Sequence, residues 1–258
     1  MDKFIIYFFL IITVLASGYS LILFKVENKR LLKLLLAFSG AFLLAISFLN
    51  LVPEIYKSQD KFPNINIGLF VLLGFVLQLF LELLTKGVEH GHSHSHSHEH
   101  TDEHDHLHED EHLHVAPLGL MIGICIHSFL EGMPIVEKFD PAVQHSLAIG
   151  IVIHNIPISF VLMSLFLASG MSKTKSFLLL GIFAIMTPLG SLLSNFLSQS
   201  FINSIPIYFD VIMGVVVGIF LHVSTSILYE TSEDHQYNRQ KFFTVIIGII
   251  IALLVPLH

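Results

Sequence analysis

The chain has 258 residues, of which 53% are hydrophobic and only 13% are charged, and its formal net charge is -7. Soluble domains usually carry about a quarter charged residues, so this composition excludes an ordinary soluble protein. The acidic balance indicates no particular partner because acids and histidines are concentrated in one segment. The single Cys125 excludes an intramolecular disulfide.

Apolar stretches of about 20 residues, each long enough to cross a bilayer as a helix, recur along the chain. The first is longer than the apolar part of a secretory signal and no small-residue cleavage site follows it, so we interpret it as a membrane span. We predict an all-α polytopic membrane protein with eight spans, at about 3–24, 31–52, 66–86, 115–135, 143–169, 175–198, 206–230 and 241–257. The predicted regions are helices one to three in 1–87, a loop in 88–114, helices four and five in 115–170, and helices six to eight in 171–258.

The distribution of Lys and Arg predicts how the chain is oriented. Loops on the cytoplasmic side of a membrane carry an excess of both residues. Placing both termini outside puts nine of the 13 Lys and Arg residues on the cytoplasmic side, namely Lys25, Lys29, Arg30, Lys33, Lys86, Lys173, Lys175, Arg239 and Lys241. We therefore expect both termini outside and the loop at 88–114 in the cytoplasm.

The loop at 88–114 is rich in histidine and acid. Neutral imidazole binds zinc, copper, nickel and ferrous iron, and neighbouring carboxylates concentrate cations. A segment of this composition cannot bury a core, so we expect a disordered loop that captures transition metal, with a solvated linker as the alternative. Its 11 histidines are His90, His92, His94, His96, His98, His100, His104, His106, His108, His112 and His114.

Two neighbouring spans carry ionisable side chains at bilayer depth, where such residues are costly and usually functional. His127 and Glu131 are four residues apart, so a helix brings imidazole and carboxylate to one face, one turn apart. In the next span His154 and Asn155 precede Pro157, which removes a backbone donor and could expose a carbonyl oxygen to a cation. These residues suggest an intramembrane metal site, with a hydrogen bond between helices as the alternative.

Further polar residues are weaker candidates for the same pathway. Glu54, near the outer end of span two, is either an entrance group or an interfacial acid. His222 in span seven is either a pathway ligand or a packed residue with a hydrogen bond. Gln78 and Glu82 are four residues apart in span three, but Glu82 also precedes Lys86 by four, so an ordinary ion pair explains it better.

Four short motifs, in this order, resemble the ZIP family of metal transporters (Zrt-, Irt-like proteins). They are Leu51-Val52-Pro53-Glu54, similar to L-x-P-E at the end of span two; His127-Ser128-x-x-Glu131-Gly132, similar to H-[NS]-x-x-[DE]-G in span four; His154-Asn155-Ile156-Pro157, similar to the start of H-[EN]-x-P-[HE]-[EG] in span five; and Gly218-x-Phe220-Leu221-His222-Val223, similar to G-x-F-L-Y-V in span seven. The resemblance covers nearly the whole chain, including the cytoplasmic His-rich loop.

The resemblance implies an eight-helix bundle in a 3+2+3 arrangement, with spans four and five at the centre of the transport path. It also implies import of zinc or a related divalent cation into the cytoplasm. By position, His127, Glu131 and His154 match the principal metal ligands of the family. Ser128 and Asn155 match positions that help hold a second ion in binuclear members.

The chain departs from the family pattern at three positions. Ile158 stands where span five usually supplies His or Glu, Ser159 replaces the next acid or glycine, and Thr187 falls where some members have Glu in span six. With these donors missing, we predict a site for one ion, and fewer carboxylates favour zinc over manganese.

The predicted function is therefore zinc transport and not catalysis, with zinc as cargo and no prosthetic group. Iron, manganese, cobalt, nickel and cadmium remain alternative cargoes. A metal exporter, a transport-impaired metal sensor or partner protein, and an intramembrane zinc hydrolase are the alternative functions. The expected location is the lipid bilayer of a bacterial cytoplasmic membrane, with no nucleic-acid partner and a homodimer as one open oligomeric state.

Overall fold

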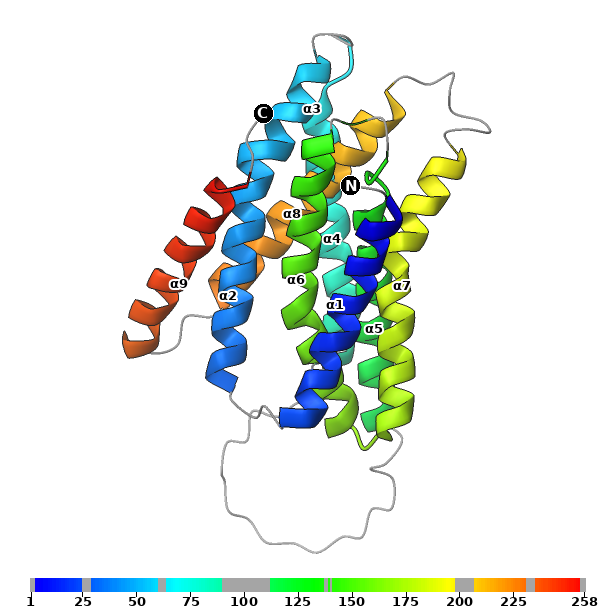
Figure 1. The fold of residues 1–258 in the computed structure, drawn as a ribbon, viewed down its shortest axis with the longest axis vertical. Coiled ribbons are helices and arrows are strands. Elements are labelled where there is room, and N and C mark those ends of the chain that lie inside the picture. Colours follow the sequence, from blue (N-terminus) through cyan, green and yellow to red (C-terminus); the bar gives the residue numbers. More distant parts are fainter. Residues whose placement is uncertain are drawn as a thin grey trace, which may run out of the picture.

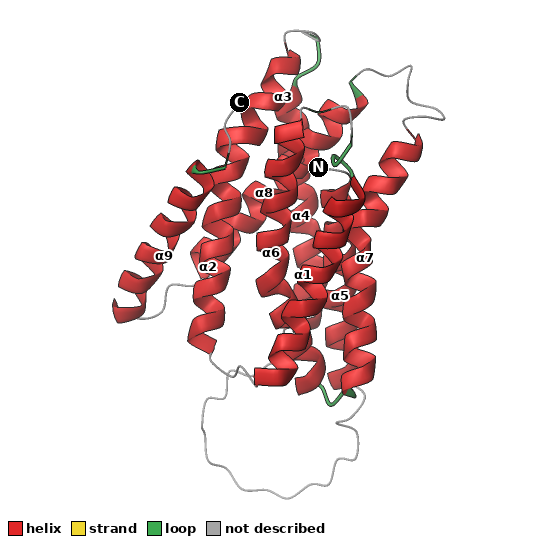
Figure 2. Ribbon diagram, viewed as in Figure 1, coloured by secondary structure: helices red, strands yellow, loops and turns green. Residues whose placement is uncertain are grey.

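The computed structural model describes residues 3–24, 29–59, 64–89, 112–136, 139, 141–197, 207–230 and 235–255. The described residues form helices and short turns and contain no strand (Figure 2). The helices are α1 (Lys3–Phe24), α2 (Lys29–Ile46), the π-helix η1 (Ser47–Leu51), α3 (Val52–Gln59), α4 (Ile67–Glu89), α5 (His112–Gly132), α6 (Pro141–Ala168), α7 (Lys173–Leu197), α8 (Tyr208–Glu230) and α9 (His235–Leu253).

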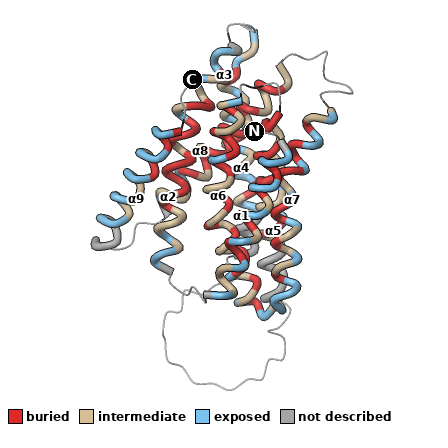
Figure 3. Tube along the Cα trace, in the orientation of Figure 1, coloured by how far each residue is buried: buried red, intermediate tan, exposed pale blue. Residues whose placement is uncertain are grey.

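Six helical segments of the described residues are long and apolar enough to cross a membrane: α1, the continuous α2–α3 segment, α4, α6, α7 and α8. α5 adds a shorter apolar stretch, Gly119–Gly132. Large apolar side chains of α4 and α9 are exposed, which suits contact with lipid. Exposed residues recur along α9 in Figure 3. The chain is therefore an all-α, multi-pass membrane protein.

The long helices pack as two groups. α1, α5, α6 and α7 pack together, and α2, α4, α8 and α9 form the other group. Contacts of α2 with α6 and of α4 with α5 join the groups. α1 begins and α9 ends toward the same end of the bundle, whereas α4 ends and α5 begins at the opposite end (Figure 1).

Glycines bring α5 and α7 into backbone contact inside the first group. A Cβ atom at Gly132 would lie 1.9 Å from the carbonyl oxygen of Thr187, and one at Gly190 would lie 1.9 Å from that of Phe129. Only glycine permits such an approach. The hydrophobic effect does not drive helices together within a membrane, so close packing at small residues stabilises their contact instead. The reciprocal contacts fix the turn of α5 that contains Glu131.

The second group has an equivalent pair in α4 and α8. A Cβ atom at Gly74 would lie 1.9 Å from the carbonyl oxygen of Val215, and one at Gly218 would lie 1.9 Å from that of Val71. Each group thus contains one pair of helices that glycines hold in register.

The second predicted span continues past its predicted end. The expectation was a span at 31–52, but the helix runs on through η1 and α3 to Gln59. Pro53 has no amide hydrogen and its ring crowds the preceding turn of an α-helix. The wider π-helical turn at Ser47–Leu51 accommodates that strain without ending the helix.

The margins of the predicted loop at 88–114 are helical. α4 extends to Glu89 and α5 begins at His112, so His112 and His114 belong to the first turn of α5. Residues 90–111, which include the other nine histidines of the loop, lie outside the described residues.

Candidate metal site

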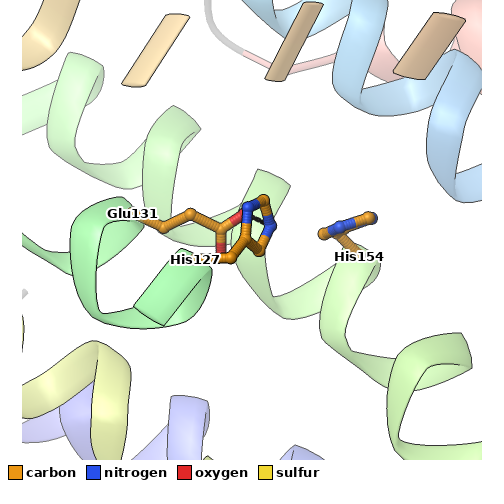
Figure 4. Close-up of side chains that lie close together, drawn as sticks. All are labelled: His127, Glu131 and His154. Atoms are coloured by element: carbon orange, nitrogen blue, oxygen red, sulfur yellow. Dashed lines mark ion pairs between the residues drawn. The ribbon is translucent and has the colours of Figure 1, made fainter. Parts of the chain in front are cut away.

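Three buried side chains from α5 and α6 meet inside the first helix group. His127 and Glu131 lie one turn apart on α5, and His154 lies on the neighbouring α6 (Figure 4). Their exposed fractions are 4%, 0% and 1%. They are the only group of three or more potential His, Cys, Asp or Glu ligands found among the described residues.

The donor atoms of these residues lie close together. Nε2 of His127 is 2.6 Å from Oε1 of Glu131, and one ligand atom from each of the three residues lies within 4.8 Å of the others. The two imidazole ring centres are 5.9 Å apart. Tetrahedral zinc with bonds of about 2.0–2.1 Å separates its donors by about 3.3–3.4 Å. Shifts on the order of 1 Å, within reach of side-chain rotation, would therefore convert this arrangement into a coordination shell.

The donors are buried without hydrogen-bond partners. Nε2 of His127, both carboxylate oxygens of Glu131 and both ring nitrogens of His154 have none among the described residues. The 2.6 Å approach of His127 to Glu131 lacks the alignment of a hydrogen bond. Buried polar atoms are almost always satisfied, because burial without a partner costs several kcal/mol. Converging, unsatisfied nitrogen and oxygen donors fit a cation better than they fit a structural hydrogen bond.

A fourth side chain reaches the site from the other helix group. Oε1 of Gln78 on α4 lies 2.9 Å from Nδ1 of His127. An amide oxygen only accepts, so when a neutral His127 donates its Nδ1–H to Gln78 the lone pair of Nε2 faces Glu131. The sequence drew attention to Gln78 only through its spacing from Glu82, since a bond between helices leaves no local pattern.

The two predicted auxiliary residues lie beside the ligands in the chain and are buried. Ser128 is 0% exposed and Asn155 is 2% exposed. Oγ of Ser128 and Oδ1 of Asn155 have no hydrogen-bond partner among the described residues. Each therefore has an unused oxygen next to a histidine of the group.

The positions that depart from the family pattern have other partners. Ile158 packs against an apolar cluster that includes Leu162. Ser159 donates a hydrogen bond of 2.6 Å to the carbonyl oxygen of Asn155. Thr187 is buried, and its carbonyl faces Gly132.

The two remaining candidates lie apart from the group. Glu54 on α3 forms an ion pair of 2.9 Å with Lys57, one turn away on the same helix. Nε2 of His222 on α8 lies 3.5 Å from Oε2 of Glu82 on α4, and its ring packs edge-on against Phe75. The structure thus gives both residues local partners.

Comparison with known proteins shows which family the chain resembles over nearly its whole length. A family model described as ZIP Zinc transporter matches residues 3–255. A protein named Zinc transporter ZupT from Chlorobium luteolum is 24% identical over 238 residues, covering 88% of this chain and 86% of the relative. A protein of the same name from Chlorobium chlorochromatii is 25% identical over 235 residues, covering 89% and 87%.

Proposed function

The chain belongs to the ZIP zinc transporter family, and we propose that it carries zinc across the membrane on His127, Glu131 and His154. The observation that carries the proposal is the convergence of three buried side chains whose donor atoms lie within 4.8 Å. The family and the relatives are described as transporters, so we propose transport in preference to hydrolysis.

The donor set supports zinc as the cargo. Two imidazoles and one carboxylate are common zinc ligands, whereas manganese and magnesium favour more oxygen donors. Three protein ligands leave a fourth position for water, for Ser128 or for Asn155. Such an open position lets the ion exchange, which a transporter requires and a closed structural site does not.

A single ion is the stoichiometry that we propose for this site. A second ion needs additional carboxylates close by, and no further acid or histidine of the described residues joins the group. Ile158 lies against an apolar cluster and Ser159 has a backbone partner, so neither position supplies a charged ligand.

The proposed topology has eight spans in a 3+2+3 arrangement. α5 and α9 are added to the six long spans to give this number. Both termini lie outside, in line with the positive-inside rule and with the common end of the bundle at which α1 begins and α9 ends (Figure 1). The cation enters from the outer side and leaves toward the His-rich loop in the cytoplasm. Relative movement of the helices around α5 and α6 exposes the site to one side at a time.

By analogy with the bacterial relatives, the host membrane is the bacterial cytoplasmic membrane.

The test is zinc flux into proteoliposomes that contain the purified full-length protein. We expect His127→Ala and Glu131→Ala each to abolish saturable flux while the protein remains folded. Thr13→Ala is the control, because its hydroxyl bonds only to backbone carbonyls of its own helix, α1. Flux that persists in both alanine variants, or a wild-type protein that carries no zinc, would overturn the proposal.

A further inference from the structure

We propose that Gln78 is a positioning residue of the metal site, because it holds His127 in the one neutral tautomer that can bind the cation through Nε2. The proposal deepens the proposed function and rests on it for the identity of the cargo. The tautomer itself is a property of the metal-free protein and can be observed without any transport.

For a neutral imidazole, the contact between Gln78 and His127 favours one tautomer. A neutral imidazole carries one N–H, and the oxygen of Gln78, 2.9 Å from Nδ1, can only accept it. In the tautomer that we propose, the proton lies on Nδ1 and Nε2 keeps its lone pair. That lone pair faces Oε1 of Glu131 at 2.6 Å, so two electron-rich atoms converge on a point that a cation would occupy.

The other tautomer would close the site. A proton on Nε2 would occupy the lone pair that a cation needs, on the side of the ring where Oε1 of Glu131 is only 2.6 Å away. Nε2 could then bind a metal only after losing that proton. By accepting from Nδ1, Gln78 keeps both donors available, as acceptors behind metal-binding histidines commonly do.

The position of Gln78 on α4 is well defined by packing. Gly74, one turn earlier, brings α4 into backbone contact with Val215 of α8. The side chain of Gln78 faces inward, since it is partly buried and reaches His127 on α5, whereas Leu79, the next residue, is 50% exposed. The acceptor is thus held by one helix group and the ligand by the other, and the hydrogen bond forms only when α4 and α5 are placed as they are here.

Two substitutions separate an acceptor role from a packing role. Gln78→Met keeps the length and shape of the side chain but removes the acceptor, whereas Gln78→Glu keeps an acceptor and adds charge. If Gln78 only fills space, methionine is tolerated and buried glutamate is harmful. If Gln78 acts as the acceptor, methionine is harmful and glutamate is tolerated. Leu79→Met is the matched control, since it adds methionine to the lipid-facing side of the same turn.

The first measurement is the KM for zinc in proteoliposomes containing the full-length protein. We expect Gln78→Met to raise KM about 10- to 100-fold, the usual cost of losing a group that orients a metal ligand. Gln78→Glu should keep KM at or below the wild-type value, and Leu79→Met should match the wild type. A wild-type KM for Gln78→Met together with a raised KM for Gln78→Glu would overturn the proposal.

The second measurement is the histidine tautomer by nitrogen NMR of the zinc-free, full-length protein labelled with ¹⁵N-histidine. The signal of His127 is the one missing from His127→Ala. We expect a proton on Nδ1 and a bare Nε2 in the wild type, and loss of that pattern in Gln78→Met. A protonated Nε2 in the wild type, or an unchanged pattern in Gln78→Met, refutes the role of Gln78. Failure of the proposed function alone would leave this spectrum intact.

Discussion

Replacing Gly132 by alanine tests how the metal site depends on the contact between α5 and α7. The added Cβ would lie 1.9 Å from the carbonyl oxygen of Thr187, whereas ordinary contacts begin at 3.4 Å. The two backbones would therefore have to separate by about 1.5 Å, the difference of those distances. The obstacle is backbone, so no side-chain rotation relieves it.

The consequence should appear in both stability and transport. Overpacking of this kind typically costs about 1–3 kcal/mol. Glu131 is the neighbouring residue, and metal ligands tolerate errors of only about 0.2 Å before coordination suffers. We expect Gly132→Ala to unfold at a lower temperature than the wild type in detergent, and to raise the KM for zinc.

The matched control for this substitution is Gly181→Ala on α7. A Cβ atom at Gly181 would meet nothing within 4 Å, and alanine favours a helix more than glycine does. Gly181→Ala should therefore keep the wild-type KM and an equal or higher Tm. If Gly132→Ala and Gly181→Ala have the same Tm and the same zinc KM, the close contact of α5 with α7 does not support the site.

Three further outcomes follow from the same geometry. Glu131→Gln keeps the shape of the side chain but removes the negative charge of a wholly buried ligand. The KM for zinc should rise by at least about tenfold, while Tm stays equal or increases. An unchanged KM would contradict the role of the carboxylate. Elemental analysis of purified protein should find one zinc ion fewer in His127→Ala than in the wild type, whereas a difference of two would contradict the single-ion site. Tyr7→Phe removes a buried hydrogen bond of 2.7 Å to Ser191, so unfolding should become easier by about 0.5–1.5 kcal/mol with no change in zinc KM; a changed KM would show that this bond also shapes the site.

Much of the helical architecture can be predicted from the sequence because apolar length alone defines a membrane span. The same holds for half of the site: a helix necessarily places His127 and Glu131 on one face, since they are four residues apart. His154 lies on another helix, so no helical spacing places its donors beside the other two, and the distance of 4.8 Å comes from the structure.

Features that depend on contacts between distant helices could not be predicted in the same way. The hydrogen bond between Gln78 and His127 joins residues 49 positions apart, and no local sequence pattern predicts it. The role of Gly132 follows from the position of Thr187 on another helix. Pro53 is typical of a helix end, yet the π-helical turn before it lets the helix continue to Gln59.

The most direct test of the central claim is anomalous diffraction at the zinc absorption edge from crystals of the full-length protein grown with zinc. The account predicts one peak within the helical bundle, about 2.0–2.2 Å from a ring nitrogen of His127, a carboxylate oxygen of Glu131 and a ring nitrogen of His154. Two peaks in the bundle, or a peak that leaves these three side chains uncoordinated, would contradict it.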